Sequence, residues 1–452
     1  MTAANEQLAQ GFTPAAVPPA LAARLALWLV VGINVVIVEA VFLAAEPARN
    51  NVLGFGKWLG LHLALIMILQ LVLIARIPWL DRRIGMDRLT SWHRWTGFTL
   101  FWLVLLHPIF ILLGYATEYH TSMLTELSNL VGQVAILAGL AAAGIILIAA
   151  GLSIRYVRRR LQYETWHAIH VCLYVAITLG LIHQMFEVST FTSSALATAY
   201  WWGLWTLALG ALIIGRVIMP FWRNARHQFR VAAVVPEADN VVSVYITGKN
   251  MESLPARAGQ FFIWRFPGHG RWWEANPFSM SAAPNGRSLR LTAKAVGKTS
   301  ANLRTIQVGT RVFAEGPYGA FTTLNRTREG ILLIAGGVGI TPIRALLEEV
   351  TGPVVVLYRA QSMRDAVLLG ELQGLANSRG ARLHVLTGRT GAGNPPNAPF
   401  EPHNLAALVP DIRERDVYVC GPNPMTTAVI RSLRTLKVPS AQIHSERFSL
   451  AG

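Results

Sequence analysis

Four histidines lie within long apolar runs, at a spacing that could hold two metal centres. His93 and His107 lie near the two ends of one run, and His170 and His183 near the two ends of another. A histidine at bilayer depth is costly unless it is paired or liganded. At about 1.5 Å rise per residue, the two histidines of each run are roughly 20 Å apart, which leaves room for two stacked macrocycles. Two axial imidazoles on each iron leave no open position, which favours electron transfer.

Alternative roles for single histidines stay open. Any one of the four could hydrogen-bond a neighbouring helix instead, and His167, one turn before His170, is an alternative ligand. The spacings also differ. Fourteen steps of about 100° from His93 return to within about 40° of the same helix face, whereas thirteen steps from His170 miss it by about 140°. We therefore expect a bulge, tilt or curvature in the fifth helix, with a π-bulge as the favoured interpretation.

The elements that must position these histidines are six apolar runs of about 20 residues, the length that spans a bilayer as a helix. They lie near 22 to 45, 57 to 79, 95 to 115, 128 to 152, 166 to 186 and 196 to 220. The composition agrees, with 53% hydrophobic and 14% charged residues. The sequence predicts a flexible tail over 1 to 20 and a six-helix transmembrane bundle over 21 to 222.

The basic residues predict how the bundle is oriented. A net charge of +16 could suggest nucleic acid. However, the arginines collect in alternate connections, such as Arg82 and Arg88 after the second run, Arg158 after the fourth and Arg223 after the sixth. The positive-inside rule then places both termini in the cytoplasm. We expect a multi-pass protein of a bacterial inner membrane, in contact with membrane lipid and without a nucleic-acid partner.

The cysteines exclude two kinds of site. The chain has only two, Cys172 within a span and Cys420 in the second half. A four-cysteine iron–sulfur cluster and a disulfide framework both need more. Any metal must therefore have other ligands.

The second half of the chain has a different pattern. Past Arg230 the apolar runs shorten and alternate, as in VVSVYITG, GQFFIWRF and LRLTAKAV, which predicts an antiparallel β-barrel over 226 to 325. An α/β domain over 326 to 452 follows. Its segment ILLIAGGVGITPIRALLEEV is typical of a strand, a Gly-rich turn and an amphipathic helix, which together offer backbone N–H groups to a pyrophosphate.

Several short motifs carry a family resemblance. NPFSMS at 276 to 281 resembles the flavin-binding strand of ferredoxin-reductase-type domains, and GKTS at 297 to 300 resembles their flavin phosphate loop. GPYG at 316 to 319 is similar to the segment that closes their barrel, and CGPNPM at 420 to 425 to their nicotinamide-side turn. With the histidine spacing, the chain resembles the ferric reductase and NADPH oxidase superfamily, which holds two haems between its third and fifth helices.

This resemblance implies the cofactors FAD, two b-type haems and NADPH, with NADH possible, and it implies the residues that hold them. The iron ligands would be His93, His107, His170 and His183. The FAD-binding residues would be Pro277, Phe278, Ser279, Lys294, Gly297 and Ser300. The nicotinamide dinucleotide would meet Gly336, Gly337, Gly339, Thr341, Pro342, Gly421 and Pro422, with Cys420 beside the nicotinamide and Phe448 over the flavin ring. Arg359 favours NADPH, because a guanidinium there could meet a 2′-phosphate.

These features predict a transmembrane oxidoreductase of the NAD(P)H oxidase or ferric-chelate reductase type. Electrons would pass from cytoplasmic NADPH through FAD and two haems to a small acceptor across the membrane. Superoxide-producing relatives place a basic residue and a further histidine beside the outer haem, whereas this chain has Ile111 one turn after His107. Dioxygen, ferric iron, quinone and a periplasmic protein therefore all stay open as acceptors. Two alternatives are a non-enzymatic haem-binding redox sensor and a membrane-anchored flavin reductase with unliganded histidines.

Overall fold

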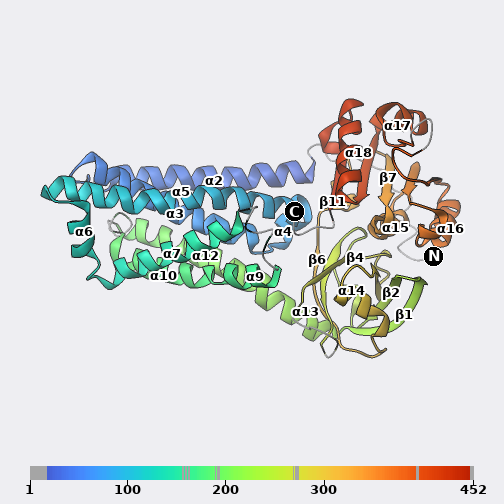
Figure 1. Cartoon of the computed structure of the whole chain (residues 1–452), viewed down its shortest axis with the longest axis horizontal. Coiled ribbons are helices and arrows are strands. Elements are labelled where there is room, and N and C mark those ends of the chain that lie inside the picture. The colour runs from blue at the N-terminus through green and yellow to red at the C-terminus, as the bar shows by residue number, and fades with distance from the viewer. Residues whose placement is uncertain are drawn as a thin grey trace. The chain divides into compact units, whose positions relative to one another are not determined.

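The computed structural model describes residues 18–154, 157, 160, 163–188, 190, 194–267, 269, 274–392 and 397–447. The chain divides into two compact units. The helical unit comprises Leu25–Ile77 and Arg88–Arg216, mostly blue to green in Figure 1. The sheet unit comprises Pro78–Asp87 and the chain from Val217 onward, together with the described residues up to Arg24.

The described chain contains six helical stretches long and apolar enough to cross a membrane. The first four are Pro19–Ala44 (α2), Asn51–Ile74 (α3), Met86–Tyr119 (α5) and Val134–Ser153 (α7). The fifth, Thr165–Glu187, is formed by α9 (Tyr163–Val171) and α10 (Leu173–Glu187). The sixth, Ala195–His227, is formed by α12 (Ala195–Ile213), η1 (Ile214–Ile218) and α13 (Met219–His227). Large apolar side chains face outward along them; Leu29, for example, is 65% exposed. Such an apolar surface suits contact with lipid. The backbone suits lipid as well, because a helix satisfies its own backbone hydrogen bonds. The six predicted spans are confirmed as helices.

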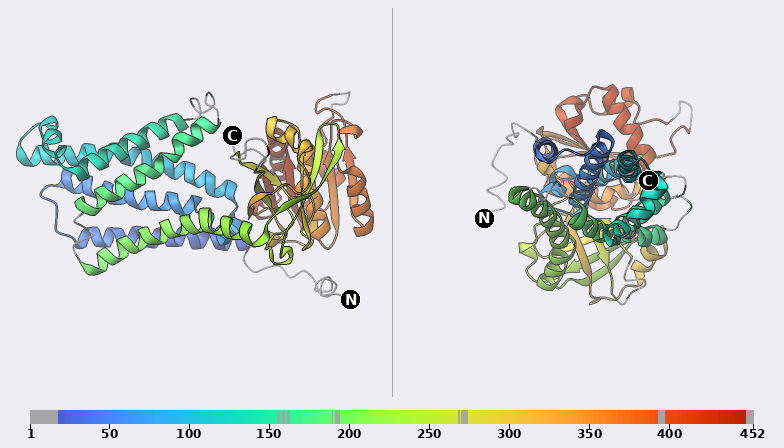
Figure 2. Two further views of the ribbon diagram at one scale, coloured as in Figure 1. Left: turned by 90° about the horizontal axis from the view of Figure 1, so that it is seen from below. Right: turned by 90° about the vertical axis from the view of Figure 1, so that its left-hand side faces the viewer.

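Polar caps and buried aromatic side chains order these helices. Asn50 and Ser194 accept hydrogen bonds from the first turns of α3 and α12, which fixes where each helix begins. Trp201 and Trp205 of α12 are 1% exposed and pack in one core with Leu71 of α3. The right-hand view of Figure 2 looks along these helices.

The fifth span is irregular between its two histidines. Helix α9 ends at Val171 and α10 begins at Leu173, with Cys172 between them. The N–H of Cys172 donates to the carbonyl of Ile169 three residues back, so the chain winds more tightly there and rotates further per residue than an α-helix. The expected irregularity is confirmed, but the π-bulge interpretation is wrong for this span. A π-helical segment occurs instead in the sixth span, as η1.

The first part of the sheet unit is antiparallel, as predicted. One sheet has the order β1-β2-β5, formed by Arg230–Ala238, Val241–Thr247 and Ser288–Lys294. The other has the order β4-β3-β6, formed by Asn276–Ser279, Phe261–Arg265 and Phe313–Tyr318. Alternate side chains point inward, and Val244, Phe262, Trp264 and Leu291 form the core between the sheets. This is the expected β-barrel domain.

The second part of the sheet unit is a parallel five-stranded sheet of order β11-β10-β7-β8-β9. Its strands are β7 (Gly330–Gly336), β8 (Val354–Arg359), β9 (Arg382–Leu386), β10 (Arg415–Gly421) and β11 (Ile443–Arg447). Leu333 packs against α15 (Ile340–Glu349) and α16 (Leu369–Arg379), whereas Leu332 packs against α17 (Pro402–Leu408) and α18 (Asn423–Thr435). Helices therefore cover both faces, which explains why the strands are apolar throughout.

A buried charge network joins the β-barrel to the α/β domain. Glu371 of α16 accepts from Arg290 of β5 at 2.9 Å and from Arg344 of α15 at 2.6 Å. Both guanidinium groups also donate to the carbonyl of Ser281. Burial acts to raise the pKa of Glu371, but the two arginines outweigh it and lower that pKa below its usual value. The network fixes the two domains of the sheet unit against each other.

Candidate functional site

The four histidines meet in two pairs between α5 and the fifth span. The ring centres of His93 and His170 are 6.1 Å apart, and those of His107 and His183 are 6.4 Å apart. His170 is therefore the residue opposite His93, whereas His167 is exposed. The break at Cys172 lies between these two histidines, and both rings of the fifth span face α5 despite their uneven spacing.

The His107–His183 pair is held by two matching small-residue motifs. Nδ1 of His107 lies 2.9 Å from the carbonyl oxygen of Gly56, and a Cβ at Gly60 would lie 2.7 Å from the His107 ring. On α7, Nδ1 of His183 lies 3.0 Å from the carbonyl oxygen of Ala135, and a Cβ at Gly139 would lie 2.8 Å from that ring. Each imidazole thus bonds to the carbonyl of a small residue and fills the space left by a glycine four residues after it. Spacings such as GKWLG mark close helix packing in membranes and could have revealed this.

The His93–His170 pair is held differently. Nδ1 of each ring is buried without a hydrogen-bond partner among the described residues. Trp166 stacks on His170 with ring centres 4.9 Å apart. Gln70 of α3 packs beside this level of the bundle, where a Cβ at Gly97 would lie 2.9 Å from its Nε2. Packing therefore contributes more to the position of these two rings than hydrogen bonds of normal geometry do, although the backbone of Gln70 lies near enough to interact with His93.

The two pairs fit haem iron. Two imidazoles that bind one metal from opposite sides place their ring centres about 6 Å apart, since each metal–nitrogen bond is about 2 Å and each ring centre lies roughly 1 Å beyond its nitrogen. The observed separations are 6.1 and 6.4 Å. Among the described residues, no three His, Cys, Asp or Glu gather to hold a metal ion by themselves. Pairs of histidines suit a metal whose other ligands come from a macrocycle.

The nucleotide motifs of the sheet unit meet at the carboxyl ends of two central strands of the parallel sheet. Strands β7 and β10 are neighbours, so the Gly-rich turn after β7 lies against the turn after β10. A Cβ at Gly339 would lie 2.2 Å from the carbonyl oxygen of Cys420, and a Cβ at Gly421 would lie 3.1 Å from the Cα of Gly336. Gly337 adopts φ +53° with open space around it. The glycines permit this close approach and leave an accessible backbone at the start of α15.

Several predicted dinucleotide residues are buried. Thr341 is 2% exposed and donates to the carbonyl of Val338, and Pro342 is also buried, so both shape the turn. Pro422 precedes the first turn of α18. Arg359 ends β8 at 9% exposure and donates to the carbonyl of Thr387 at 2.8 Å. Burial lowers the pKa of Arg359.

The predicted flavin residues lie on two parts of the β-barrel. Pro277, Phe278 and Ser279 form β4 and pair with β3, where Ser279 is buried. Lys294 is exposed at the end of β5. Ser300 accepts hydrogen bonds at 3.0 Å from the N–H groups of Val296 and Gly297. That hydroxyl therefore closes its own turn.

The structure adds a buried acidic site that the sequence did not indicate. Glu446 of β11 has Oε2 buried without a hydrogen-bond partner among the described residues. Burial, and then the charges of Asp87 and Asp81, raise the pKa of Glu446 well above its usual range. Burial, and then Glu446, raise the pKa of the Cys420 thiol, which agrees with a packing role for this cysteine. Nothing in the HSERF segment alone shows that its glutamate is enclosed.

A short helix of the sheet unit reaches the GPYG segment. Helix α4 (Pro78–Ile84) lies between the second and third spans in sequence. Its Asp81 is 2% exposed and accepts a hydrogen bond at 3.0 Å from the N–H of Gly319. Phe448, the predicted cover of the flavin ring, lies outside the described residues.

Three family models match successive parts of the chain. Residues 55–181 match the ferric reductase like transmembrane component, 226–322 an FAD-binding domain and 333–431 an oxidoreductase NAD-binding domain. This is the architecture of the ferric reductase and NADPH oxidase-like superfamily. The chain is a multi-pass membrane protein with FAD-binding and NAD-binding domains, and it spans slightly less than two thirds of the length of the first curated relatives it matches.

Individual relatives cover mainly the second half. The chain is 32% identical over 239 residues to the ferredoxin reductase component of 3-ketosteroid-9-alpha-monooxygenase from Mycobacterium tuberculosis, covering 49% of this chain and 65% of that protein. It is 26% identical over 314 residues to a flavohemoprotein from Xylella fastidiosa, covering 65% of this chain and 78% of that protein. A solved flavohem-like FAD/NAD-binding domain of nitric oxide dioxygenase from Vibrio cholerae O1 biovar El Tor is 25% identical, with a TM-score of 0.41, covering 49% of this chain and 98% of that structure.

Proposed function

We propose that this protein carries electrons from NADPH, through FAD and two b-type haems, to a small acceptor on the other side of the membrane. The observation that carries the proposal is the meeting of four histidines in two pairs between two membrane helices. The ring centres are 6.1 Å apart within one pair and 6.4 Å apart within the other. The FAD-binding and NAD-binding domains that follow supply the other end of such a path.

The chain's residues prepare the two histidine levels in different ways. When bound, FAD accepts the two electrons of a hydride and passes them on singly, and bis-imidazole haem iron carries one electron at a time. His107 and His183 direct Nδ1 to backbone carbonyls, so Nδ1 keeps its proton and the Nε2 lone pair is left for a metal. The surrounding apolar helices exclude water from both levels.

The acceptor and the setting are parts of the same proposal. Dioxygen, giving superoxide, and ferric iron are the proposed acceptors, with quinone as a third. The arginines of alternate connections support an orientation with both termini in the cytoplasm. The proposed setting is a bacterial inner membrane. NADPH would then be drawn from the cytoplasm.

An anaerobic visible spectrum of the purified full-length protein, before and after NADPH, tests the electron path. We expect b-type haem bands that sharpen on reduction, and loss of about half the haem in His93→Ala and in His183→Ala, because each removes one of two axial ligands. His120→Ala, at an exposed position, is the matched control. Two outcomes would favour the membrane-anchored flavin reductase: no haem in the purified protein, or haem that stays oxidised while FAD is reduced. Haem that is present, with neither FAD nor haem reduced by NADPH, would favour a redox sensor.

Arg359 tests the choice of dinucleotide. Its guanidinium lies at the end of β8, and we expect Arg359→Gln to raise the KM for NADPH about tenfold while leaving that for NADH nearly unchanged, because a charge-assisted bond to the 2′-phosphate is lost. Arg364→Gln is the control. An equal increase in the KM for NADPH and for NADH would show that Arg359 only supports the fold, through its hydrogen bond to the carbonyl of Thr387.

A further inference from the structure

An apolar stripe lies on the first helical turns of the sheet unit. The side chains that form it are exposed by between 49% and 63%: Val217, Ile218, Phe221 and Trp222. All four belong to the helical stretch Ala195–His227. Aromatic side chains concentrate where a membrane meets water. The stripe ends at Trp222, and Arg223 and Arg226 follow it. An aromatic residue followed by arginines is typical of a helix that leaves a membrane, which would put the membrane surface at this turn of α13.

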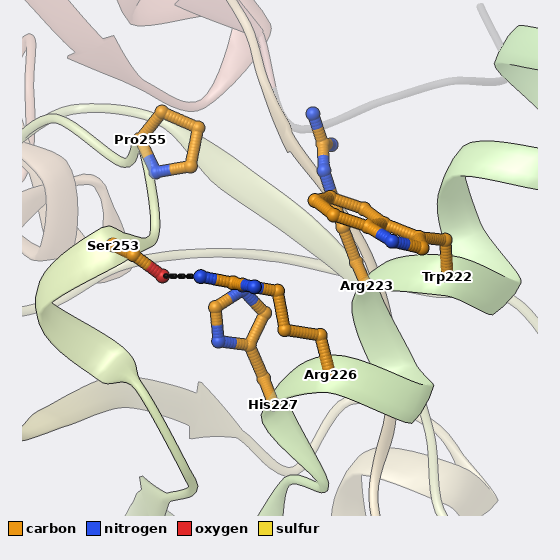
Figure 3. A pocket seen from close by; sticks show the side chains of 6 residues that line it. All are labelled: Trp222, Arg223, Arg226, His227, Ser253 and Pro255. Atoms are coloured by element: carbon orange, nitrogen blue, oxygen red, sulfur yellow. Dashed lines mark hydrogen bonds between the residues drawn. The ribbon is translucent and has the colours of Figure 1, made fainter.

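A cationic pocket opens at the end of the stripe (Figure 3). It is lined by Trp222, Arg223, Arg226 and His227 of α13, and by Ser253 and Pro255 of the segment before β3. The Arg226 guanidinium lies 5.7 Å from the Trp222 ring centre and 3.4 Å from Ser253 Oγ. The six lining residues include two guanidinium groups and no carboxylate.

More positive charge lies close behind the pocket. Arg82 of α4 is near enough to Arg223 for their like charges to interact. Burial, and then the charge of Arg257, lower the pKa of Arg82, although Asp81 partly opposes this. Nε of Arg82 is buried without a hydrogen-bond partner among the described residues. Converging cations of this kind are stabilised by an anion.

We propose that this pocket binds the phosphate of an anionic membrane lipid, with its acyl chains along the stripe. A pocket of arginines at the membrane surface recognises such headgroups, and Arg226 over Trp222 is placed to meet one. The flavin phosphates are a poorer match. Helix α13 packs on β6, through Asn224 and Ala314, at the opposite edge of the β4-β3-β6 sheet from Pro277 to Ser279. The site lies outside the electron path proposed above and does not depend on it.

Native mass spectrometry of the full-length protein in detergent tests the proposal. Phosphatidylglycerol is titrated against phosphatidylcholine, and the ratio of bound states gives each affinity. We expect phosphatidylglycerol to bind more tightly, and Arg226→Gln to weaken it about fivefold, the effect of removing one cation at a membrane surface. Arg226→Lys should keep most of the affinity. Arg431→Gln, which removes one exposed arginine from α18, should change nothing.

Four outcomes would overturn the proposal. Equal binding of the two lipids would remove the headgroup preference, and an equal loss in Arg226→Gln and Arg431→Gln would reduce it to net charge. Displacement of the lipid by inorganic phosphate at the same concentration would show a free phosphate site. Loss of bound FAD from Arg226→Gln, in protein that still elutes as one species, would assign the pocket to the flavin.

Discussion

The two histidine pairs lie between the same two spans but are built by different means. At the His107–His183 pair, backbone carbonyls accept from both rings, and Gly60 and Gly139 leave the space that each ring fills. At the His93–His170 pair, both Nδ1 atoms are buried and have no hydrogen-bond partner among the described residues. Backbone carbonyls orient the rings of one pair, whereas packing orients the rings of the other.

This difference has an energetic consequence. A buried polar atom without a partner costs about 1–3 kcal/mol, whereas a hydrogen bond to a carbonyl contributes about 1 kcal/mol. The His93–His170 level therefore carries a cost that the His107–His183 level does not. A metal bound through Nε2 would leave that cost in place, because the unpartnered atoms are Nδ1. Matched spacing in the sequence therefore does not imply matched support in the fold.

The largest effect should come from filling the space beside the carbonyl-bonded rings. In Gly139→Ala the new methyl group would lie 2.8 Å from the His183 ring, and in Gly60→Ala it would lie 2.7 Å from the His107 ring. Each ring must rotate away from its present position, so under the proposed function we expect each variant to lose close to half of the haem, measured as haem per FAD. Gly144→Ala on the same helix as Gly139 meets nothing within 4 Å and should keep its haem. Full haem in Gly139→Ala would contradict the steric argument.

A smaller effect should separate the two pairs in haem-depleted protein. His93→Leu removes an unpartnered buried nitrogen, so we expect an unchanged or higher unfolding temperature. His107→Leu loses the bond to the carbonyl of Gly56, so we expect a loss of about 1 kcal/mol and a lower unfolding temperature. Thermal unfolding in detergent measures both. A lower unfolding temperature for His93→Leu than for His107→Leu would reverse the comparison.

The smallest effect should come from the glycine at the His93 level. A methyl group at Gly97 would lie 2.9 Å from Nε2 of Gln70, which is the far end of a flexible side chain. That amide can move, so we expect Gly97→Ala to keep nearly all of its haem and to change the stability by less than about 1 kcal/mol. If Gly97→Ala lost as much haem as Gly60→Ala, both levels would be equally constrained by glycine.

Local patterns in the sequence were sufficient to predict much of this protein. Apolar length fixes the six spans, because a helix must cross the full hydrocarbon layer. Alternation and the Gly-rich turn predict the β-barrel and the parallel sheet, since both depend on neighbouring residues. The uneven step from His170 to His183 also predicts a distortion, which the structure places at Cys172.

Contacts between distant segments were decided only by the tertiary structure. The ring of His183 meets Ala135 and Gly139 because α7 and α10 pack side by side. The small-residue spacing of α7 predicts close packing but does not say which helix or which histidine fills the space. The approach of Gly339 to Cys420 follows from the strand order, and the burial of Glu446 follows from its surroundings. The sequence by itself determined which residues could do chemistry. Helix crossing and strand order, which set distances between segments far apart in the chain, decided which of them meet.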